Sequence, residues 1–476
     1  MLNIGHPVAA FGGYTVTGHE AAITSFEIDS REVKPGSVFV AFAGEQVDGH
    51  KYVSKAFESG AAIALVERPV DGYPAVAAGE TLGTLPASPF CLVVDSTMAG
   101  LQQIARFWRN QFKNLKVIGI TGSVGKTTTK ELIWNVLSNR FSTLKTPKNY
   151  NNEIGLPLTI LQLKPEHTHA VLEMGMYEKG EIELLCEIAR PEVGVLTIIG
   201  PVHMSRLGSI EAIVEAKREL VEALPSAEDD GIAILNKDDH HVMSMASHSK
   251  AQVFTYGLDA SADLWADNIS SMGLEGIAFT MHHQGESWSV SVPLLGRHSV
   301  HTALRATATG LAVGLSMDEI ILGLKSSKNQ MRLVTVRGPN ESLIIDDTYN
   351  ASPASVIAAL NLLDDLVLDG GRKIAVLGDM LELGSAEEEG HRRVGSRAVQ
   401  VSDILVTVGE RGKIIGNEAI NAGMPEEKVH ILDNAILATE LLQSIIESTD
   451  IVLIKGSLGA RMDRIVANLS RTKGEQ

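Results

Sequence analysis

The sequence predicts an α/β protein of three domains, in which helices cover largely parallel sheets. The chain has 476 residues, whereas one hydrophobic core rarely grows beyond ~250–300 residues. Short apolar runs alternate with helix-like stretches along most of the chain, which is typical of parallel sheets. One of these runs leads through a glycine-rich turn into a helix, as phosphate-binding loops do.

The first domain is expected to span residues 1–108 and to be a small α/β domain. The apolar runs 38–42 and 61–66 are predicted strands, and residues 53–59 are a predicted helix. Asp48-Gly49 marks a turn before this helix. A further helix over residues 98–112 leads into the next domain.

The second domain is expected at residues 109–330. A strand at 115–120 precedes the glycine-rich turn and a helix at 130–141 follows it. Apolar runs at 170–172, 193–199 and 231–235 then alternate with helical stretches, which predicts a largely parallel sheet with helices on both faces. Ligands bind at the carboxyl ends of strands in such sheets. Polar residues follow the runs there: Glu173, His203, Asn236, Asp238 and Asp239.

The third domain, residues 331–476, repeats the alternation and is predicted to be doubly wound and Rossmann-like. Its expected strands are 343–345, 373–377, 404–408, 429–432 and 451–454. No Gly-x-Gly-x-x-Gly pattern follows the first of them, so a dinucleotide cofactor is not expected.

The glycine-rich turn reads Gly-Ile-Thr-Gly-Ser-Val-Gly-Lys-Thr-Thr-Thr over residues 119–129. Lys126 would reach the β- and γ-phosphates of a nucleotide, and the Thr127 hydroxyl would ligate Mg²⁺. The strict pattern has glycine where Ile120 stands, and a tight turn before an ordinary helix is the alternative. Lysine before three threonines, directly after a buried strand, favours an ATP or GTP site. The expected contacts are Gly122, Ser123, Val124, Gly125, Lys126, Thr127 and Thr128.

Three residues are candidates for metal binding. Glu173 is a good Mg²⁺ candidate because this ion prefers carboxylate and phosphate oxygens. His203 is a candidate by position only. Lys217 lies on the apolar stripe of a predicted helix over residues 209–224. It either extends its ammonium to water or is a dry amine with a lowered pKa that captures CO₂ as a carbamate, and the spacing favours the first reading.

Composition excludes several classes of function. The net charge of −17 argues against a nucleic-acid surface. Cys91 and Cys186 are the only cysteines, which favours a reducing compartment without a disulfide framework. No signal peptide or membrane span is expected, and the predicted location is the cytoplasm.

With these residues assembled, the chain resembles the Mur ligases, the ATP-dependent amide ligases of peptidoglycan precursor synthesis. The N-terminal pattern includes Asp29-Ser-Arg31 and Asp48-Gly-His50. The central pattern includes residues 122–128, Asn149-Tyr-Asn-Asn-Glu-Ile-Gly155, Glu173-Met-Gly175 and Glu215-Ala-Lys217. In this family the lysine matching Lys217 is carbamylated and binds a second Mg²⁺ together with the histidine that matches His203.

The C-terminal pattern is Asp346-Asp-Thr-Tyr-Asn-Ala-Ser-Pro353, then Gly378-Asp-Met-Leu-Glu-Leu-Gly384 with His391, then Lys455-Gly-Ser457. It resembles the type that adds D-alanyl-D-alanine, and the Asp-Asn-Pro-Arg motif of the diamino-acid-adding type is absent. The family's Gly-x-His-Asn-x-x-Asn segment reads Gly296-Arg-His-Ser-Val-His301 here, and Ser299 and His301 replace its asparagines. Ile198 and Leu458 are further departures.

The resemblance implies a set of site residues. Lys126, His203 and Lys217 are expected to be catalytic, and Thr127, Glu173, His203 and Lys217 to bind two Mg²⁺ ions. Nucleotide contacts beyond the loop are expected from Asn236, Asp239, Arg332, Asp347, Tyr349 and Asn350. Substrate contacts are expected from Ser30, Arg31, Asp48, Asn149, Asn151, Asn152 and Lys455.

The resemblance also implies the reaction and its reactants. ATP would phosphorylate the carboxylate of a UDP-N-acetylmuramoyl-tripeptide, and the amine of D-alanyl-D-alanine would displace phosphate from the acyl phosphate, on a monomeric enzyme. The alternatives are a sibling ligase that adds a diamino acid or glutamate, a non-catalytic nucleotide-binding regulator on the same fold, and a small-molecule phosphotransferase.

Overall fold

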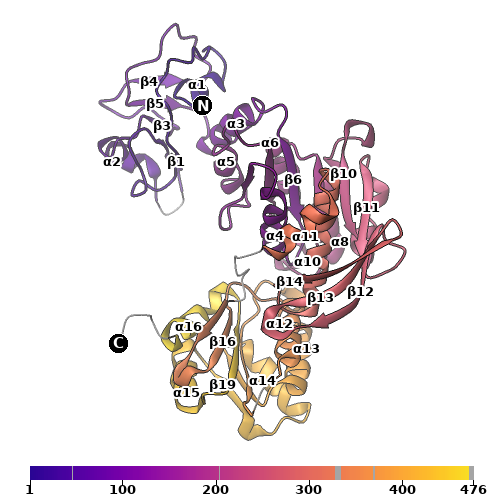
Figure 1. Cartoon of the computed structure of the whole chain (residues 1–476). Coiled ribbons are helices and arrows are strands. Elements are labelled where there is room, and N and C mark those ends of the chain that lie inside the picture. Colours follow the sequence, from indigo (N-terminus) through magenta and orange to yellow (C-terminus); the bar gives the residue numbers. More distant parts are fainter. Residues whose placement is uncertain (45–46, 203, 327–333, 368–369, 471–476) are drawn as a thin grey trace.

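The computed structural model describes residues 1–44, 47–202, 204–326, 334–367 and 370–470. Three domains follow one another along the chain (Figure 1). The N-terminal domain lies at one end, the central domain in the middle and the C-terminal domain at the other end. This arrangement confirms the predicted α/β class with three separate sheets.

The N-terminal domain is built on a parallel sheet with the strand order β1-β2-β3-β5-β4. Its strands are β1 (Phe26–Glu27), β2 (Val38–Val40), β3 (Ile63–Val66), β4 (Ala75–Ala77) and β5 (Phe90–Val93), with helices α1 (Gly5–Ala9) and α2 (Val53–Glu58). The predictions of β2, β3 and α2 are confirmed, whereas β4 and β5 were not predicted.

Helix α3 (Thr97–Arg109) connects the first two domains. Ser96 begins it, because its side chain accepts a hydrogen bond from the backbone N–H of Ala99. At its other end, Trp108 Nε1 donates to Leu163 O at 3.2 Å and Arg109 Nε donates to Ala189 O at 2.8 Å. The helix therefore crosses the proposed boundary at residue 108 and fastens its last turn to the central domain.

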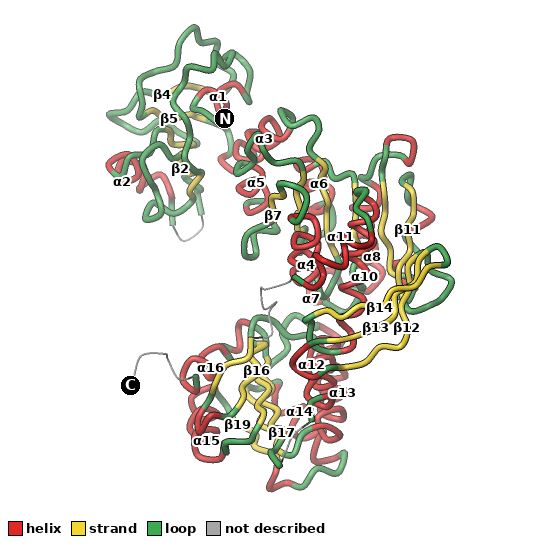
Figure 2. The backbone as a smooth tube through the Cα atoms, viewed as in Figure 1, coloured by secondary structure: helices red, strands yellow, loops and turns green. Residues whose placement is uncertain are grey.

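The central domain contains a nine-stranded sheet in the order β14-β13-β12-β11-β10-β9-β6-β8-β7. Its strands are β6 (Lys116–Thr121), β7 (Thr143–Lys145), β8 (His169–Glu173), β9 (Val193–Leu196), β10 (Ile232–Asn236), β11 (Gln252–Gly257), β12 (Leu264–Ser271), β13 (Ile277–His283) and β14 (Glu286–Val292). The pairs from β7 to β12 are parallel, and β12, β13 and β14 form an antiparallel extension. Figure 2 shows these three strands as one yellow band.

Helices cover both faces of the parallel part of this sheet. Helices α4 (Lys126–Ser138), α10 (Val300–Ala312) and α11 (Met317–Lys325) share one hydrophobic core with it. Helices α6 (Glu181–Ala189) and α8 (Ile210–Glu222) belong to the core on the other face, which also contains α5 (Gly155–Ile160). The expected start of the first helix at residue 130 was wrong, because the threonines after Lys126 already form its first turn.

The C-terminal domain has the strand order β15-β16-β20-β17-β18-β19, and all its pairs are parallel except β15–β16. The strands are β15 (Val334–Arg337), β16 (Leu343–Asp347), β17 (Lys373–Gly378), β18 (Ile404–Val408), β19 (Val429–Leu432) and β20 (Ile451–Lys455). Helices α12 (Pro353–Asp365), α13 (Glu387–Val401) and α14 (Gly412–Asn421) pack on one face, and α15 (Ala435–Ile445) and α16 (Asp463–Leu469) on the other. The predicted doubly wound domain is confirmed.

Within the described ranges, no helix is both long and apolar enough to cross a membrane.

Candidate active site

A cavity of about 980 Å³ lies between the central and C-terminal domains. The glycine-rich turn within residues 119–129, called the phosphate-loop turn below, lines it from one side together with the carboxyl ends of β8 and β10. The segments after β16 and β20 line it from the other side. It brings together most of the predicted site residues: Ser123, Val124, Gly125, Lys126, Thr127, Thr128, Asn149, Asn151, Asn152, Glu173, Lys217, Asn236, Asp347, Tyr349, Asn350 and Lys455.

The phosphate-loop turn requires glycine at two positions. Gly122 has φ 143°, and a Cβ atom there would lie 1.8 Å from Thr197 Oγ1. Gly125 has φ 87° and is the N-cap residue of α4. Both backbone conformations are rare for residues with a side chain. The turn thereby points the N-terminus of a thirteen-residue helix at the cavity, which is where an anion binds favourably.

Lys126 folds back over this turn. Its Nζ donates to Gly122 O at 2.7 Å and to Ser123 O at 3.3 Å. Ser123 fastens the turn to the segment after β9, because its backbone N donates to Ile198 O at 2.8 Å and its Oγ lies 3.0 Å from both the N and the O atom of Gly200. The turn is therefore held in shape by its own side chains.

Glu173 is a buried carboxylate of the site. It ends β8 and is 3% exposed. Its Oε2 accepts a hydrogen bond from Thr127 Oγ1 at 2.8 Å, and its Oε1 accepts one from Asn151 Nδ2 at 2.9 Å. A buried carboxylate beside a hydroxyl and a phosphate-binding turn is a set of hard oxygen donors, which fits Mg²⁺.

Lys217 lies on α8 and also lines the cavity, although its side chain is buried at 1% exposure. Within the described part of the chain, no group forms a hydrogen bond or ion pair with its Nζ. Burial lowers the pKa of Lys217 well below its usual value, and the charge of Lys126 lowers it further. The structure thus favours the dry amine over an ammonium in water. His203 and Arg332 lie outside the described residues.

Asn236 ends β10, and Asp238 and Asp239 follow it. Asn236 is 3% exposed and lines the cavity. Asp239 lies outside the cavity lining; its Oδ1 accepts from His241 N at the start of α9 (His240–Met243), and its Oδ2 accepts from Ile199 N at 2.8 Å. It therefore joins the segment after β9 to the segment after β10.

One prediction for the segment 296–302 was wrong. Counting Gly-x-His-Asn-x-x-Asn from Gly296 places the second asparagine at Thr302, so the assignment of this position to His301 was wrong by one residue. His301 Nε2 instead pairs with Asp238 Oδ2 at 2.7 Å. Burial would raise the pKa of Asp238, but the hydrogen bond from His301 and those from two backbone N–H groups lower it overall.

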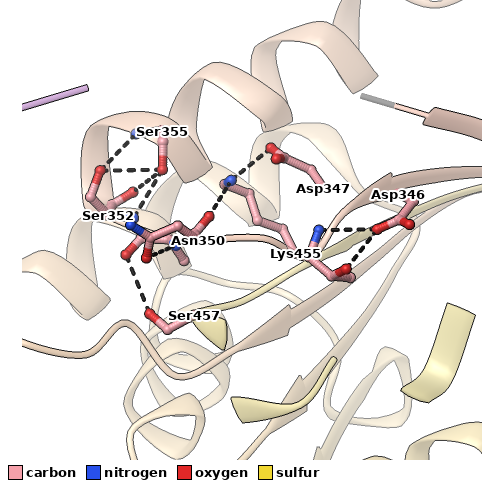
Figure 3. A network of polar contacts seen from close by, with 9 residues as sticks. Asp346, Asp347, Asn350, Ser352, Ser355, Lys455 and Ser457 are labelled. Carbon is pink, nitrogen blue, oxygen red and sulfur yellow. Dashed lines mark hydrogen bonds and ion pairs between the residues drawn. The ribbon is translucent and has the colours of Figure 1, made fainter. Parts of the chain in front are cut away.

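In the C-terminal domain, Lys455 forms the centre of a polar network (Figure 3). Its side chain is 2% exposed, and its Nζ lies 2.6 Å from Asp347 Oδ2 and donates to Asn350 O at 2.8 Å. Ser457 Oγ accepts from Leu381 N at 3.0 Å. The network brings together segments after β16, β17 and β20 at the carboxyl edge of this sheet.

His391 forms two hydrogen bonds with the backbone near the same edge. Its Nδ1 donates to Glu387 O at 2.6 Å, and its Nε2 accepts from Met380 N at 3.1 Å. Burial lowers its pKa. The two hydrogen bonds hold the segment 380–384, of which Leu381, Glu382 and Leu383 line the cavity.

The predicted N-terminal contacts lie away from this cavity. Ser30 and Arg31 follow β1, and Asp48 follows β2, so all three are at the carboxyl edge of the N-terminal sheet. Arg31 pairs with Asp29, which lowers the pKa of Asp29 to about 2. Asp48 accepts from Arg68 Nη2 at 2.5 Å and from His50 N at 3.0 Å, and these bonds hold its pKa well below the usual value.

Sequence reasoning missed three charged residues that line the cavity, Glu181, Glu382 and Arg305. Arg305 is the cation among them. It lies on α10 and is 4% exposed. Arg305 is the only charged residue in the stretch 303–312, and this isolated charge was a signal that could have revealed it.

Three family models match successive parts of the chain. Residues 120–310 match the Mur ligase middle domain, residues 331–458 the Mur ligase glutamate ligase domain, and residues 22–83 the Mur ligase family catalytic domain.

The relatives match over nearly the full chain. The UDP-N-acetylmuramoyl-tripeptide--D-alanyl-D-alanine ligase of Bacillus subtilis is 37% identical, with 94% of each chain covered. A crystal structure of MurF from Acinetobacter baumannii superposes with a TM-score of 0.83 at 31% identity, over 98% of both chains. MurF ligase from Thermotoga maritima in complex with ADP gives a TM-score of 0.77 at 28% identity, over 93% of this chain and 96% of that one.

Proposed function

Because the chain belongs to the Mur ligase family, we propose that it is the ATP-dependent ligase that adds D-alanyl-D-alanine to UDP-N-acetylmuramoyl-tripeptide in peptidoglycan synthesis. The observation that carries this function is the identity of 37% over 94% of both chains with a ligase of that activity. The cavity between the phosphate-loop turn and the Lys455 network supports it.

The reaction needs little covalent chemistry from the protein. The carboxylate of the tripeptide attacks the γ-phosphorus of ATP, ADP leaves, and an acyl phosphate forms. The amine of D-alanyl-D-alanine then attacks the acyl carbon, phosphate leaves, and the amine loses its proton. Positioning and charge neutralisation carry such phosphoryl transfers. Lys126 and the first turn of α4 would hold the triphosphate. A MurF ligase from Thermotoga maritima has been solved in complex with ADP, which supports a nucleotide site in this fold.

Mg²⁺ fits the residues around Glu173, and Thr127 and Glu173 would hold the first ion. Bound there, it would offset repulsion between the substrate carboxylate and the triphosphate. Lys217, as a carbamate, and His203 would hold the second ion. A buried amine with a lowered pKa is the form that reacts with CO₂, which supports this assignment.

The remaining substrate and nucleotide contacts would come from residues of all three domains. Ser30, Arg31 and Asp48 would bind the uridine diphosphate end of the substrate, and Asn149, Asn151, Asn152 and Lys455 would bind its peptide end and the incoming dipeptide. Asn236, Asp239, Arg332, Asp347, Tyr349 and Asn350 would contribute to the nucleotide site. The proposed domains are residues 1–108, 109–330 and 331–476.

The proposed enzyme is a monomer of the cytoplasm. Its two cysteines, Cys91 and Cys186, are buried and unpaired, which suits a reducing compartment.

Phosphate release tests the function directly. With ATP, Mg²⁺ and UDP-N-acetylmuramoyl-tripeptide, we expect release only when D-alanyl-D-alanine is added, and little release with lysine, diaminopimelate or glutamate. Equal product formation with a diamino acid would indicate the sibling activity. No release with any amine would favour a non-catalytic regulator.

A further inference from the structure

Arg305 is a buried cation of the cavity whose described partners are all uncharged. On α10, its Nε donates to Thr129 Oγ1 at 2.9 Å, its Nη1 to Tyr256 OH at 3.2 Å and its Nη2 to Thr302 Oγ1 at 2.8 Å. Among the described residues, no carboxylate forms an ion pair with the guanidinium within 4.0 Å. A guanidinium has five N–H donors, so these bonds leave part of its capacity unused.

An uncompensated buried charge is costly. Moving an ion out of water is unfavourable unless an opposite charge or a full set of hydrogen bonds replaces the water. Three neutral oxygens satisfy the hydrogen-bond requirement only in part, and they leave the charge without a counterpart. The cavity on which Arg305 borders is therefore the place where the opposite charge would enter.

The position of Arg305 indicates which charge that is. Thr129 belongs to the first turn of α4, directly after Lys126, Thr127 and Thr128. A Cβ atom on Gly125 would lie 3.4 Å from Arg305 Nη2. The guanidinium thus lies against the phosphate-loop turn and the helix N-terminus. Arginine is well suited to this place, because its planar fork can donate two hydrogen bonds to a phosphate.

We propose that Arg305 is a further nucleotide-binding residue, which supplies the positive charge for the phosphates on the α10 side of the turn. The inference rests on the proposed ATP site. It divides the work between two cations: Lys126 acts from within the turn, and Arg305 acts from the neighbouring helix. The alternative is a purely structural role, in which Arg305 only ties α10 to Thr129 and Tyr256.

The test compares nucleotide affinity in two matched variants. Arg305→Met removes the charge and keeps most of the buried stem. Arg297→Met removes a charge from the segment preceding the same helix, where the side chain is 62% exposed and pairs with Asp365. Calorimetry measures binding of ATP, ADP, AMP and adenosine without turnover, and urea denaturation reports the stability of each variant.

We expect Arg305→Met to bind ADP about tenfold or more weakly, the usual cost of losing a hydrogen bond to a charged group. The loss of affinity in Arg305→Met should be largest for ATP and smallest for adenosine. Arg297→Met should bind all four ligands with the affinity of the wild type. A folded Arg305→Met with wild-type affinity for ADP would overturn the inference and leave the structural role. An equal loss for adenosine would also overturn it, because the contact would then be to the nucleoside.

Two further measurements cover a variant that does not fold. Arg305→Gln is neutral and keeps a hydrogen-bonding group near Thr129 and Tyr256, and it should show the same loss of ADP affinity. A structure of the wild-type chain with ADP should place a guanidinium nitrogen of Arg305 within hydrogen-bond distance of a phosphate oxygen. A longer separation would contradict the inference. Failure of the wild-type chain to bind ADP would contradict the nucleotide site itself.

Discussion

At the scale of residues, two lysines of the site differ in their surroundings. Lys126 donates to carbonyl oxygens of its own turn, whereas Lys217 is buried and the positive charge of Lys126 adds to the effect of burial on its pKa. The two side chains are expected to carry opposite charges in the active enzyme. Lys126 would be a cation for phosphate, and Lys217 would become an anion by taking up CO₂.

Lys126→Ala should lower the rate of phosphate release by at least about 10²–10³-fold, the effect of removing one preorganised donor from a transition state. Single-turnover phosphate release with both substrates measures it. The far-ultraviolet circular dichroism of the variant should match that of the wild type, because Lys126 packs on the surface of the turn. Near-normal release from a folded variant would contradict the role of Lys126.

Lys217→Ala should remove most activity, because a negative ligand of one Mg²⁺ would be lost. A short carboxylic acid added to the assay should restore part of the rate, since it can occupy the space of the missing carbamate. Lys179→Ala is the matched control, because Lys179 is an exposed lysine that pairs with Glu215 on α8. An alanine variant at position 217 with the wild-type rate would rule out the carbamate.

At the scale of elements, the sequence predicted the parallel strands better than the antiparallel ones. Continuous apolar runs such as those in β6, β17 and β20 are buried on both faces, so they stand out. Strands β12 and β13 alternate between buried and more exposed residues, and this weaker period-two pattern was missed, although Gly285 marks the hairpin after β13.

The site could be predicted in parts but not as a whole. Local patterns identified Lys126, Glu173 and Asn236, because each lies at or just after the end of a buried strand. The juxtaposition of these residues with Lys455 depends on how two domains pack, which no local pattern encodes. The same is true of Arg305, two of whose three partners lie 176 and 49 residues away in the sequence.

Strand β8 gives the central domain a pH-dependent stability. His169 begins this strand, stacks on Phe141 with ring centroids 4.0 Å apart, and is 7% exposed. Burial, and then the charge of Lys116, lower its pKa from the usual value of about 6.5 to about 4. In the unfolded chain His169 therefore takes up a proton below about pH 6.5, whereas in the folded chain it does so only near pH 4.

Stability from His169 is accordingly complete above about pH 6.5 and is lost as the pH falls toward 4. Between about pH 7.5 and pH 5 the free energy of unfolding should fall by about 2 kcal/mol through this residue. His169→Gln should lack that part of the fall, and His19→Gln, at an exposed position, should retain it. Urea titrations at both pH values measure the difference. Parallel pH profiles for all three proteins would refute the assignment.

At the scale of the whole molecule, three sheets each present a carboxyl edge that carries polar residues. The central and C-terminal edges already meet in one cavity, whereas the N-terminal domain, which carries Ser30, Arg31 and Asp48, lies at one end of the molecule (Figure 1). A substrate with a nucleotide at one end and a peptide at the other suits this geometry. Domain closure around it would shield the acyl phosphate from water.

The central claim is that the substrate carboxylate is activated as an acyl phosphate in this cavity. Tracing a heavy oxygen isotope tests it most directly. UDP-N-acetylmuramoyl-tripeptide labelled in its reacting carboxylate is converted with ATP and D-alanyl-D-alanine, and the released phosphate is examined by mass spectrometry. We predict that each phosphate carries one oxygen from the carboxylate, since the carbon–oxygen bond breaks when the amine attacks. Unlabelled phosphate accompanying the peptide product would contradict the account.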